Sequence, residues 1–136
     1  MNKPKQVILV RKDLEMSAGK TASQVAHASI AVFLNMTHKL FDPSLSVVRR
    51  EFEVMRNSAM DQWLDGDFTK IVLGVENEEE IRHLHRLAQV HGLPCSMIID
   101  NGDTVFNGVE TLTAVAIGPA YSDQIDPITS HLSLLK

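Results

Sequence analysis

Three polar side chains in this sequence have types and positions suited to hydrolysing an ester. Lys20 lies at the start of a predicted helix, Asp100 at the end of a predicted strand, and Thr113 at the start of another strand. Strand ends and helix starts meet along one edge of an α/β sheet, so the three side chains are expected to share one site. There Asp100 could orient or deprotonate a water molecule. Lys20 and the N–H groups at the helix start could stabilise an oxyanion, and Thr113 could donate a hydrogen bond.

Each of the three residues also has an ordinary structural interpretation. Lys20 suits the solvated first turn of a helix, and Thr113 suits any strand. Asp100 precedes Asn101-Gly102, which is a turn signal, and its side chain could simply form that turn. Spacing alone leaves both interpretations open.

A phosphate-binding loop is excluded by the residues that precede Lys20. The segment Gly19-Lys20-Thr21 imitates the end of such a loop. The full pattern, G-x-x-x-x-G-K-[ST], needs an earlier glycine so that the backbone can wrap the phosphates. Leu14 occupies that position, so the pattern predicts no nucleotide-hydrolysing site.

The helix predicted from Lys20 to about residue 35 has two distinct faces. At about 100° per residue, Lys20, Gln24 and His27 share a narrow polar arc. His27 could therefore serve a site, although a core or surface histidine fits equally well. The opposite face is mostly small and is expected to lie against a sheet; it contains Ala22, Val25, Ala26, Ser29, Val32 and Phe33.

The remaining apolar patterns predict an α/β fold. Short apolar runs rich in β-branched residues predict strands at residues 6–11, 69–75, 94–99 and 112–117. Helical spacing predicts further helices at residues 44–64, 77–91 and within 122–132. This order predicts three α/β/α layers, with helices on both faces of a largely parallel sheet of four strands. The link between the last two strands is short, so that pair could be antiparallel.

Pro127 leaves the start of the last helix open. In one arrangement Ser122 caps the helix and Pro127 kinks it. In the other, Asp126 is the cap and Pro127 takes the first helical position. Both arrangements place a short helix near the end of the sequence.

Length and composition fit a single domain of residues 1–136. Hydrophobic residues make up 44% of the 136, which is enough for one core. No apolar run approaches the ~20 residues that span a bilayer, and the first residues lack a signal-peptide pattern. Cys95 is the only cysteine, so neither an intrachain disulfide nor a multi-cysteine metal site is expected. We expect a cytosolic enzyme or binding protein that has no membrane partner.

Charge is unevenly distributed along the sequence. The net charge of −4 argues mildly against a nucleic-acid partner. Residues 1–60, however, hold 9 Lys/Arg and 5 Asp/Glu, whereas residues 61–136 hold 4 and 12. Solvated, scattered charge would explain this pattern. One basic face on an acidic body would explain it too, formed by Lys3, Lys5, Arg11, Lys12 and Lys20.

Two segments near the ends of the chain carry specific motifs. Residues 7–28 read VILVRKDLEMSAGKTASQVAHA, and residues 113–134 read TAVAIGPAYSDQIDPITSHLSL. Between them lie WLDGDFTKIVLGV and GLPCSMIIDNG. In this order the four segments resemble the type 2 peptidyl-tRNA hydrolase family, whose helix start is similar to GKxAAQxxHA and whose last strand is similar to T-x-x-x-I-G-P.

The resemblance implies a fold and an activity. Members of the family cleave the ester that joins a peptide to tRNA, in the cytoplasm, with no required metal or nucleotide cofactor. The implied fold is a four-stranded mixed sheet between helices, often in a homodimer. The implied catalytic residues are Lys20, Asp100 and Thr113. The residues expected to contact the substrate are Gln24, His27, Arg11, Lys12 and Thr111.

Two departures from the family pattern bear on the site. Residues 34–62 are longer than the family's link between the first helix and Trp63. The stretch from Asp100 to Thr113 is one residue longer, so Thr111 competes for the role of the site threonine. Two alternatives to peptidyl-tRNA hydrolysis stay open: a non-catalytic relative that binds a protein or ligand, and a hydrolase of another ester or amide.

Overall fold

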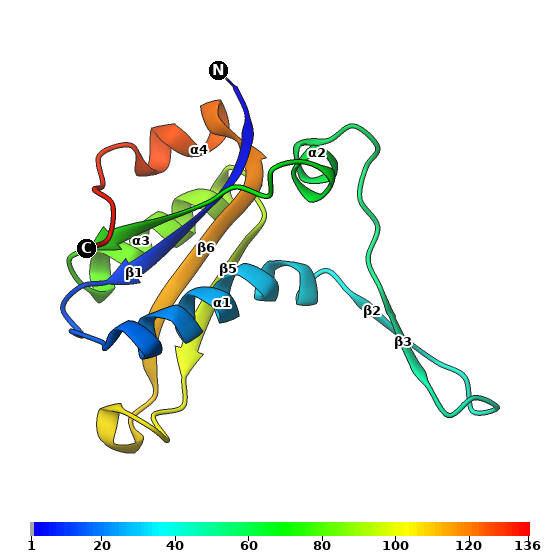
Figure 1. Ribbon diagram of the computed structural model, residues 1–136, viewed down its shortest axis with the longest axis horizontal. Helices are drawn as coiled ribbons and strands as arrows, with labels where there is room; N and C mark the ends of the chain where they lie inside the picture. The colour runs from blue at the N-terminus through cyan, green and yellow to red at the C-terminus, as the bar shows by residue number, and fades with distance from the viewer. Residues whose placement is uncertain (1) are drawn as a thin grey trace.

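A four-stranded sheet forms the centre of the molecule (Figure 1). The computed structural model describes residues 2–136. In spatial order the strands are β4 (Lys70–Val75), β1 (Pro4–Arg11), β6 (Thr111–Tyr121) and β5 (Cys95–Asp100). β1 runs parallel to β4 and antiparallel to β6, and β5 pairs antiparallel with β6. The sheet is thus mixed, as the resemblance implied, and the expectation of a largely parallel sheet was wrong.

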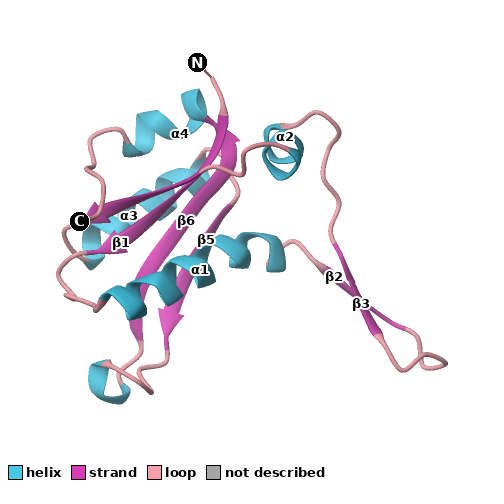
Figure 2. Ribbon diagram, viewed as in Figure 1, coloured by secondary structure: helices cyan, strands magenta, loops and turns pink. Residues whose placement is uncertain are grey.

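Helices cover both faces of this sheet (Figure 2). They are α1 (Ala18–Leu34), α2 (Ala59–Asp65), α3 (Glu78–Val90) and α4 (Ser122–Thr129). Val7 and Leu9 of β1 belong to the core that α3 and α4 cover, whereas Ile8 and Val10 belong to the core under α1 and α2. Successive strand residues point to opposite faces, so a strand between two helical layers is apolar throughout. The predicted three-layer α/β/α fold is confirmed.

The helix predicted at residues 44–64 is wrong over most of its length. In its place are β2 (His38–Phe41) and β3 (Val48–Glu51), which form a separate antiparallel hairpin. This hairpin projects away from the body of the molecule, beyond the C-terminal end of α1 (Figure 1). Within the predicted segment only residues 59–64 are helical, and α2 ends at Asp65.

Local side-chain chemistry explains why the hairpin replaces a helix. The Asp42 carboxylate accepts hydrogen bonds from the backbone N–H and the hydroxyl of Ser44, at 2.9 and 2.7 Å, which stabilises a turn. Val47 and Val48 follow, and paired β-branched residues favour a strand over a helix. Ser58 then starts α2 anew, because its hydroxyl accepts from the backbone N–H of Asp61 at 3.2 Å.

α1 presents a different face to the sheet from the one predicted. Its buried residues are Gln24, Ala28 and Val32, whereas Ala22 and Ala26 are exposed. A glutamine can be buried at this position because its polar atoms have hydrogen-bond partners there. The small face of α1 instead borders an open groove of about 940 Å³ beside β4, which we call the apolar groove. Its lining includes Val25, Ile30, Phe33, Trp63, Phe68 and Leu135.

The last helix begins one residue earlier than the arrangement capped by Ser122 and five residues earlier than the one capped by Asp126. Tyr121 occupies the N-cap position of α4, and Pro127 lies inside the helix. The Gln124 side chain supports this start by accepting a hydrogen bond from the Tyr121 backbone N–H at 3.2 Å. Ile125 and Ile128 are buried on either side of Pro127, so packing stabilises a helix that lacks one backbone hydrogen bond.

Candidate active site

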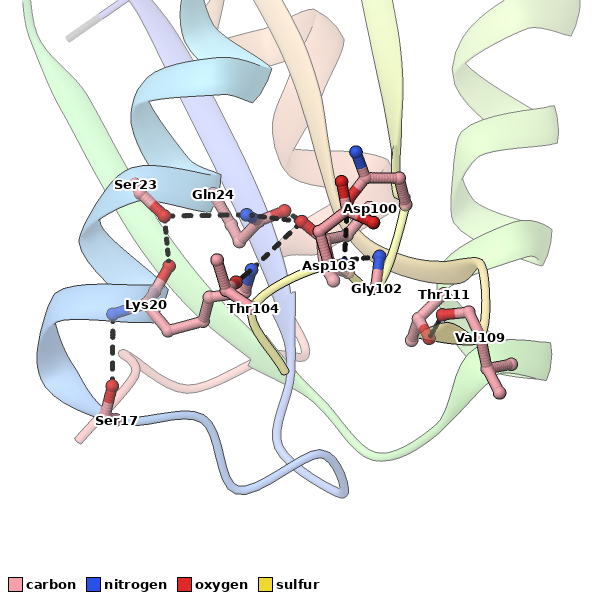
Figure 3. A network of polar contacts seen from close by, with 12 residues as sticks. Ser17, Lys20, Ser23, Gln24, Asp100, Gly102, Asp103, Thr104, Val109 and Thr111 are labelled. Carbon is pink, nitrogen blue, oxygen red and sulfur yellow. Dashed lines mark hydrogen bonds and ion pairs between the residues drawn. The ribbon is translucent and has the colours of Figure 1, made fainter. Parts of the chain in front are cut away.

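One edge of the sheet gathers the ends of several elements. The C-terminal ends of β1 and β5, the start of β6 and the first turn of α1 lie together there (Figures 1 and 3). Ser17 sets where α1 begins, because its hydroxyl accepts a hydrogen bond from the backbone N–H of Lys20 at 3.2 Å. Lys20 is therefore held in the first turn, on the side that faces the end of β5.

Lys20 and Asp100 form an ion pair at this edge (Figure 3). The Lys20 Nζ lies 3.0 Å from Asp100 Oδ1, and the two side chains are only 12% and 13% exposed. Lys20 Nζ also donates to the Thr104 hydroxyl at 2.9 Å. Partial burial reduces solvent screening, so the pair is held more firmly than a surface ion pair.

The surroundings of Asp100 favour its ionised form. The hydrogen bond from Lys20 lowers the pKa of Asp100 below its usual value, and this effect outweighs burial, which acts in the opposite direction. The backbone N–H of Gly102 adds to the lowering, because it donates to Asp100 Oδ2 at 3.0 Å. Asp100 is therefore a carboxylate at neutral pH, which can accept hydrogen bonds but not donate them.

Thr113 reaches Asp100 only through Gln24. The buried Thr113 hydroxyl donates to Gln24 Oε1 at 2.5 Å. The amide nitrogen at the other side of Gln24 lies 3.4 Å from Asp100 Oδ1. Thr113 thus fixes the orientation of the Gln24 amide, so that its NH₂ group faces the carboxylate.

Thr111 occupies a different place from Thr113. It is the residue of β6 directly opposite Asp100 of β5, and it is half-buried. Its hydroxyl donates to the backbone carbonyl of Val109 at 2.9 Å (Figure 3). Thr111 therefore lies at the edge of the sheet near Asp100, whereas Thr113 lies inside it.

Comparison with known proteins decides the family. The family described as Peptidyl-tRNA hydrolase PTH2 matches residues 4–135 of this chain. The chain belongs to the PTH2 family. A Peptidyl-tRNA hydrolase of Methanocaldococcus jannaschii is 39% identical to it over 131 residues, which cover 96% of this chain and 99% of that protein. Relatives with the same name from Methanopyrus kandleri and Sulfolobus acidocaldarius are 36% and 34% identical, over 97% and 96% of this chain and 98% and 99% of their own lengths. The resemblance inferred from the motifs is confirmed.

Two other residues expected at this PTH2 site, Arg11 and Lys12, are bound to acidic side chains. Arg11 pairs with Asp13 at 2.7 Å and lies 3.5 Å from Glu78. Lys12 pairs with Glu76 at 2.5 Å. The positive charge at this edge is therefore largely neutralised by carboxylates of the chain itself.

The basic face considered from the sequence does not form. Lys3 and Lys5 lie at the opposite end of β1 from Arg11, and Lys5 pairs with Asp126 at 2.6 Å. About six residues of extended strand separate Lys5 from Arg11, roughly 20 Å. His27 was predicted to share an arc of the first helix with Lys20 and Gln24. In the structure it is exposed on α1, about one turn beyond Gln24, which is buried.

The loop after Asp100 supplies partners that the sequence alone did not identify. Thr104 binds Lys20, and the Phe106 ring centroid lies 5.7 Å from Lys20 Nζ. Gly102 has a φ of +84°, and a Cβ there would lie 2.6 Å from the backbone N and O of Val109. The only signal for this loop was the turn pattern at Asn101-Gly102, which marks a turn without showing that it folds over the lysine.

The described part of the chain offers neither a cluster of metal ligands nor a membrane-spanning helix. Residues 2–136 contain no group of three or more His, Cys, Asp or Glu side chains that could hold a metal ion. Among the same residues, no helix has the length and hydropathy needed to span a bilayer. Cys95 is half-buried, and burial raises the pKa of its thiol.

Proposed function

We propose that this chain hydrolyses the ester bond between peptide and tRNA in peptidyl-tRNA, releasing free tRNA. The observation that carries the proposal is the shielded Lys20–Asp100 pair, at 3.0 Å, in a chain that matches the PTH2 family over residues 4–135. The hydrolase names of relatives at 34–39% identity support the same reaction. We further propose that the protein binds the tRNA portion of the substrate and acts in the cytoplasm, where peptidyl-tRNA arises during translation.

Lys20 is suited to stabilise the oxyanion of the reaction. An ammonium group has three N–H donors. Within residues 2–136, Asp100 and Thr104 accept from Lys20, which leaves one donor for the carbonyl oxygen of the substrate. The partial positive charge at the N-terminus of α1 acts in the same direction. Negative charge that develops as water adds to the ester is thereby stabilised.

Asp100 is suited to orient the attacking water. A carboxylate of lowered pKa is a weak base but a good hydrogen-bond acceptor. Water held by Asp100 adds to the ester carbonyl, and the tetrahedral intermediate then collapses. The ribose oxygen leaves with a proton, giving a free peptide and a free tRNA. Gln24 and Thr113 act as positioning residues, because they fix the hydrogen bonds around Asp100.

An assay of tRNA release from a peptidyl-tRNA tests the proposal. Lys20→Ala is expected to lower kcat by roughly 10²–10³-fold, the usual effect of losing one oxyanion donor. Asp100→Asn is expected to lower kcat by roughly 10²–10⁴-fold. Arg86→Ala is a control, because Arg86 is an exposed cation further along α3 that contacts none of the site residues. Wild-type protein that releases no tRNA would contradict the reaction, and turnover unaffected by both site variants would contradict the residue roles.

We also propose that the protein is a homodimer. The apolar groove supports this, because it leaves large apolar side chains open on one face of α1. Ile30 and Phe68 are 56% and 49% exposed in the single chain. A second copy covering this face would remove that apolar surface from water.

A further inference from the structure

The hairpin formed by residues 38–51, which we call the arm, lacks a packed face. All eight residues of its strands β2 and β3 are exposed. It extends from the far end of α1, away from the sheet (Figure 1). A lone two-stranded hairpin is only marginally stable in water, so the arm is expected to be stabilised by contact with a binding partner.

The register of the arm places two cations directly opposite each other. Lys39 pairs with Arg50 across the strands, so their side chains emerge on the same face. Like charges in that arrangement repel each other, and within residues 2–136 neither side chain has an ion-pair partner. Arg49 emerges on the other face, where it lies 3.7 Å from Glu51 of the same strand. One face of the arm therefore carries uncompensated positive charge.

The next pair on this face is apolar. Phe41 lies opposite Val48, two residues along each strand from Lys39 and Arg50. Phe41 is 71% exposed. An exposed aromatic ring beside two cations suits a nucleic acid, because the cations attract phosphates while the ring packs against a ribose or an unpaired base.

The candidate active site offers no comparable charge to RNA. Its three cations, Arg11, Lys12 and Lys20, each lie within 3.0 Å of a carboxylate oxygen. The chain as a whole carries a net charge of −4, whereas the arm holds three Lys/Arg and two Asp/Glu. A phosphate backbone is therefore attracted more strongly by the arm than by the edge of the sheet that holds Lys20.

We propose that the Lys39–Arg50 face of the arm binds the phosphate backbone of the tRNA while the ester lies at Lys20 and Asp100. This inference rests on the proposed function. α1 connects the two places: its 17 residues span about 25 Å, with Lys20 near one end and the arm beyond the other. A substrate that contains a folded RNA is long enough to contact both, whereas the peptide ester alone is not.

A binding assay tests the inference. Fluorescence anisotropy measures the Kd of labelled, deacylated tRNA for the full chain at a series of salt concentrations. The double variant Lys39→Ala/Arg50→Ala is expected to raise Kd on the order of tenfold at low salt. The slope of log Kd against log salt should fall by roughly 1.4–1.8, since two phosphate contacts are lost. Arg49→Ala removes a cation from the other face of the same strand and should leave Kd within about twofold.

A charge reversal separates binding from folding of the arm. Lys39→Glu places a carboxylate opposite Arg50, so the arm is expected to become more stable to heat. The same change should weaken tRNA binding at least as much as the single variant Lys39→Ala. A purely structural role for Lys39 would give the opposite result, with tRNA binding maintained or improved.

Three other outcomes are informative. An unchanged Kd and salt slope in the double variant would overturn the role of the arm. A changed sedimentation coefficient with unchanged tRNA binding would also overturn it and would assign the arm to contacts between copies of the chain. Turnover of peptidyl-tRNA by the same wild-type preparation keeps the two proposals apart, because arm-dependent tRNA binding without turnover contradicts only the proposed reaction.

Discussion

At the scale of single residues, the site depends on one ionised pair and on the groups that hold it. Lys20 and Asp100 come from α1 and β5, and their contact is shielded by the loop that contains Gly102 and Thr104. Gln24, which Thr113 orients from within the core, donates to the same oxygen of Asp100 that Lys20 contacts. A change at any of these residues is therefore expected to alter both the protonation of Asp100 and the geometry of the site.

Lys20→Met is expected to raise the pKa of Asp100 toward its usual value of about 3.9, because the main cause of its lowered pKa is removed. A ¹³C NMR titration of the carboxyl carbons measures this change. Asp13 provides an internal control, since its pKa is lowered by Arg11 and should stay low in the variant. An unchanged Asp100 titration would show that Lys20 is not the cause.

The same lowered pKa makes stability depend on pH. A carboxyl with a lower pKa when folded stabilises the protein above its unfolded pKa of about 3.9, and this contribution is lost as pH falls through the folded value. The free energy of unfolding of wild type should therefore exceed that of Asp100→Asn most at neutral pH, with the difference narrowing below about pH 4. Urea denaturation at a series of pH values measures it. A constant difference across that range would contradict the assignment.

Thr113→Val is expected to lower the free energy of unfolding by about 1–3 kcal/mol, because Gln24 Oε1 loses its buried partner. The Gln24 amide is then free to turn, so kcat for peptidyl-tRNA should fall as well. Thr113→Ser keeps the hydroxyl and is the matched control, expected to restore kcat. Failure of serine to restore activity would assign Thr113 to packing rather than to positioning.

At the scale of secondary-structure elements, the sequence predicted the positions of most strands and helices better than it predicted which face of a helix is buried. Continuous apolar runs located β1 and β6, because a strand covered on both faces must be apolar throughout. The helical spacing of apolar residues in 44–64 led to a wrong prediction of a helix. An exposed hairpin can have apolar residues at the same spacing without burying their side chains. The face of α1 was misjudged because a buried Gln24 is indistinguishable from a solvated one until Thr113 and Asp100 are known to lie beside it. The Lys20–Asp100 contact was predictable, because both residues lie at element ends that meet at one edge.

Gly102→Ala is expected to disrupt the loop that shields Lys20. Its φ of +84° disfavours alanine, and the added Cβ would lie 2.6 Å from the Val109 backbone. Loss of about 1–3 kcal/mol in the free energy of unfolding and a lower kcat should follow. Gly92→Ala is the matched control, because Gly92 also has a positive φ, of +69°, but no atom lies within 4 Å of its Cβ position. Equal losses in the two variants would show that backbone strain, rather than contact with Val109, is the cause.

At the scale of the whole molecule, two surfaces are left without a partner in the single chain. The arm carries unpaired cations, and the apolar groove exposes large apolar side chains. The two differ in chemistry, which is why we attribute one to tRNA and the other to a second copy of the chain. The groove lies along α1, from Ala18 to Phe33, whereas the arm begins beyond the end of that helix, so a second copy and a tRNA could be bound at the same time.

Ile30→Glu is expected to shift the protein from dimer to monomer, because the substitution introduces a charge into the apolar groove. Sedimentation velocity over a range of concentrations measures the change. His27→Glu introduces the same side chain at an exposed position of α1 that does not line this groove, and should leave the dimer intact. A wild-type protein that is monomeric throughout the range would contradict the homodimer.

The pairing of β1 with β6 has a consequence for how the chain folds. The first strand, β1, can pair with β6 only after the last strand has been made. Lys20 likewise contacts Asp100, which lies 80 positions further along the chain. Closing loops of this length costs entropy before the contacts that offset it can form, so such sheets fold slowly. While the chain is being synthesised, β1 leaves the ribosome early with both edges unpaired. The proposed catalytic pair is thus expected to be one of the last features to form, so a partly made chain should be inactive.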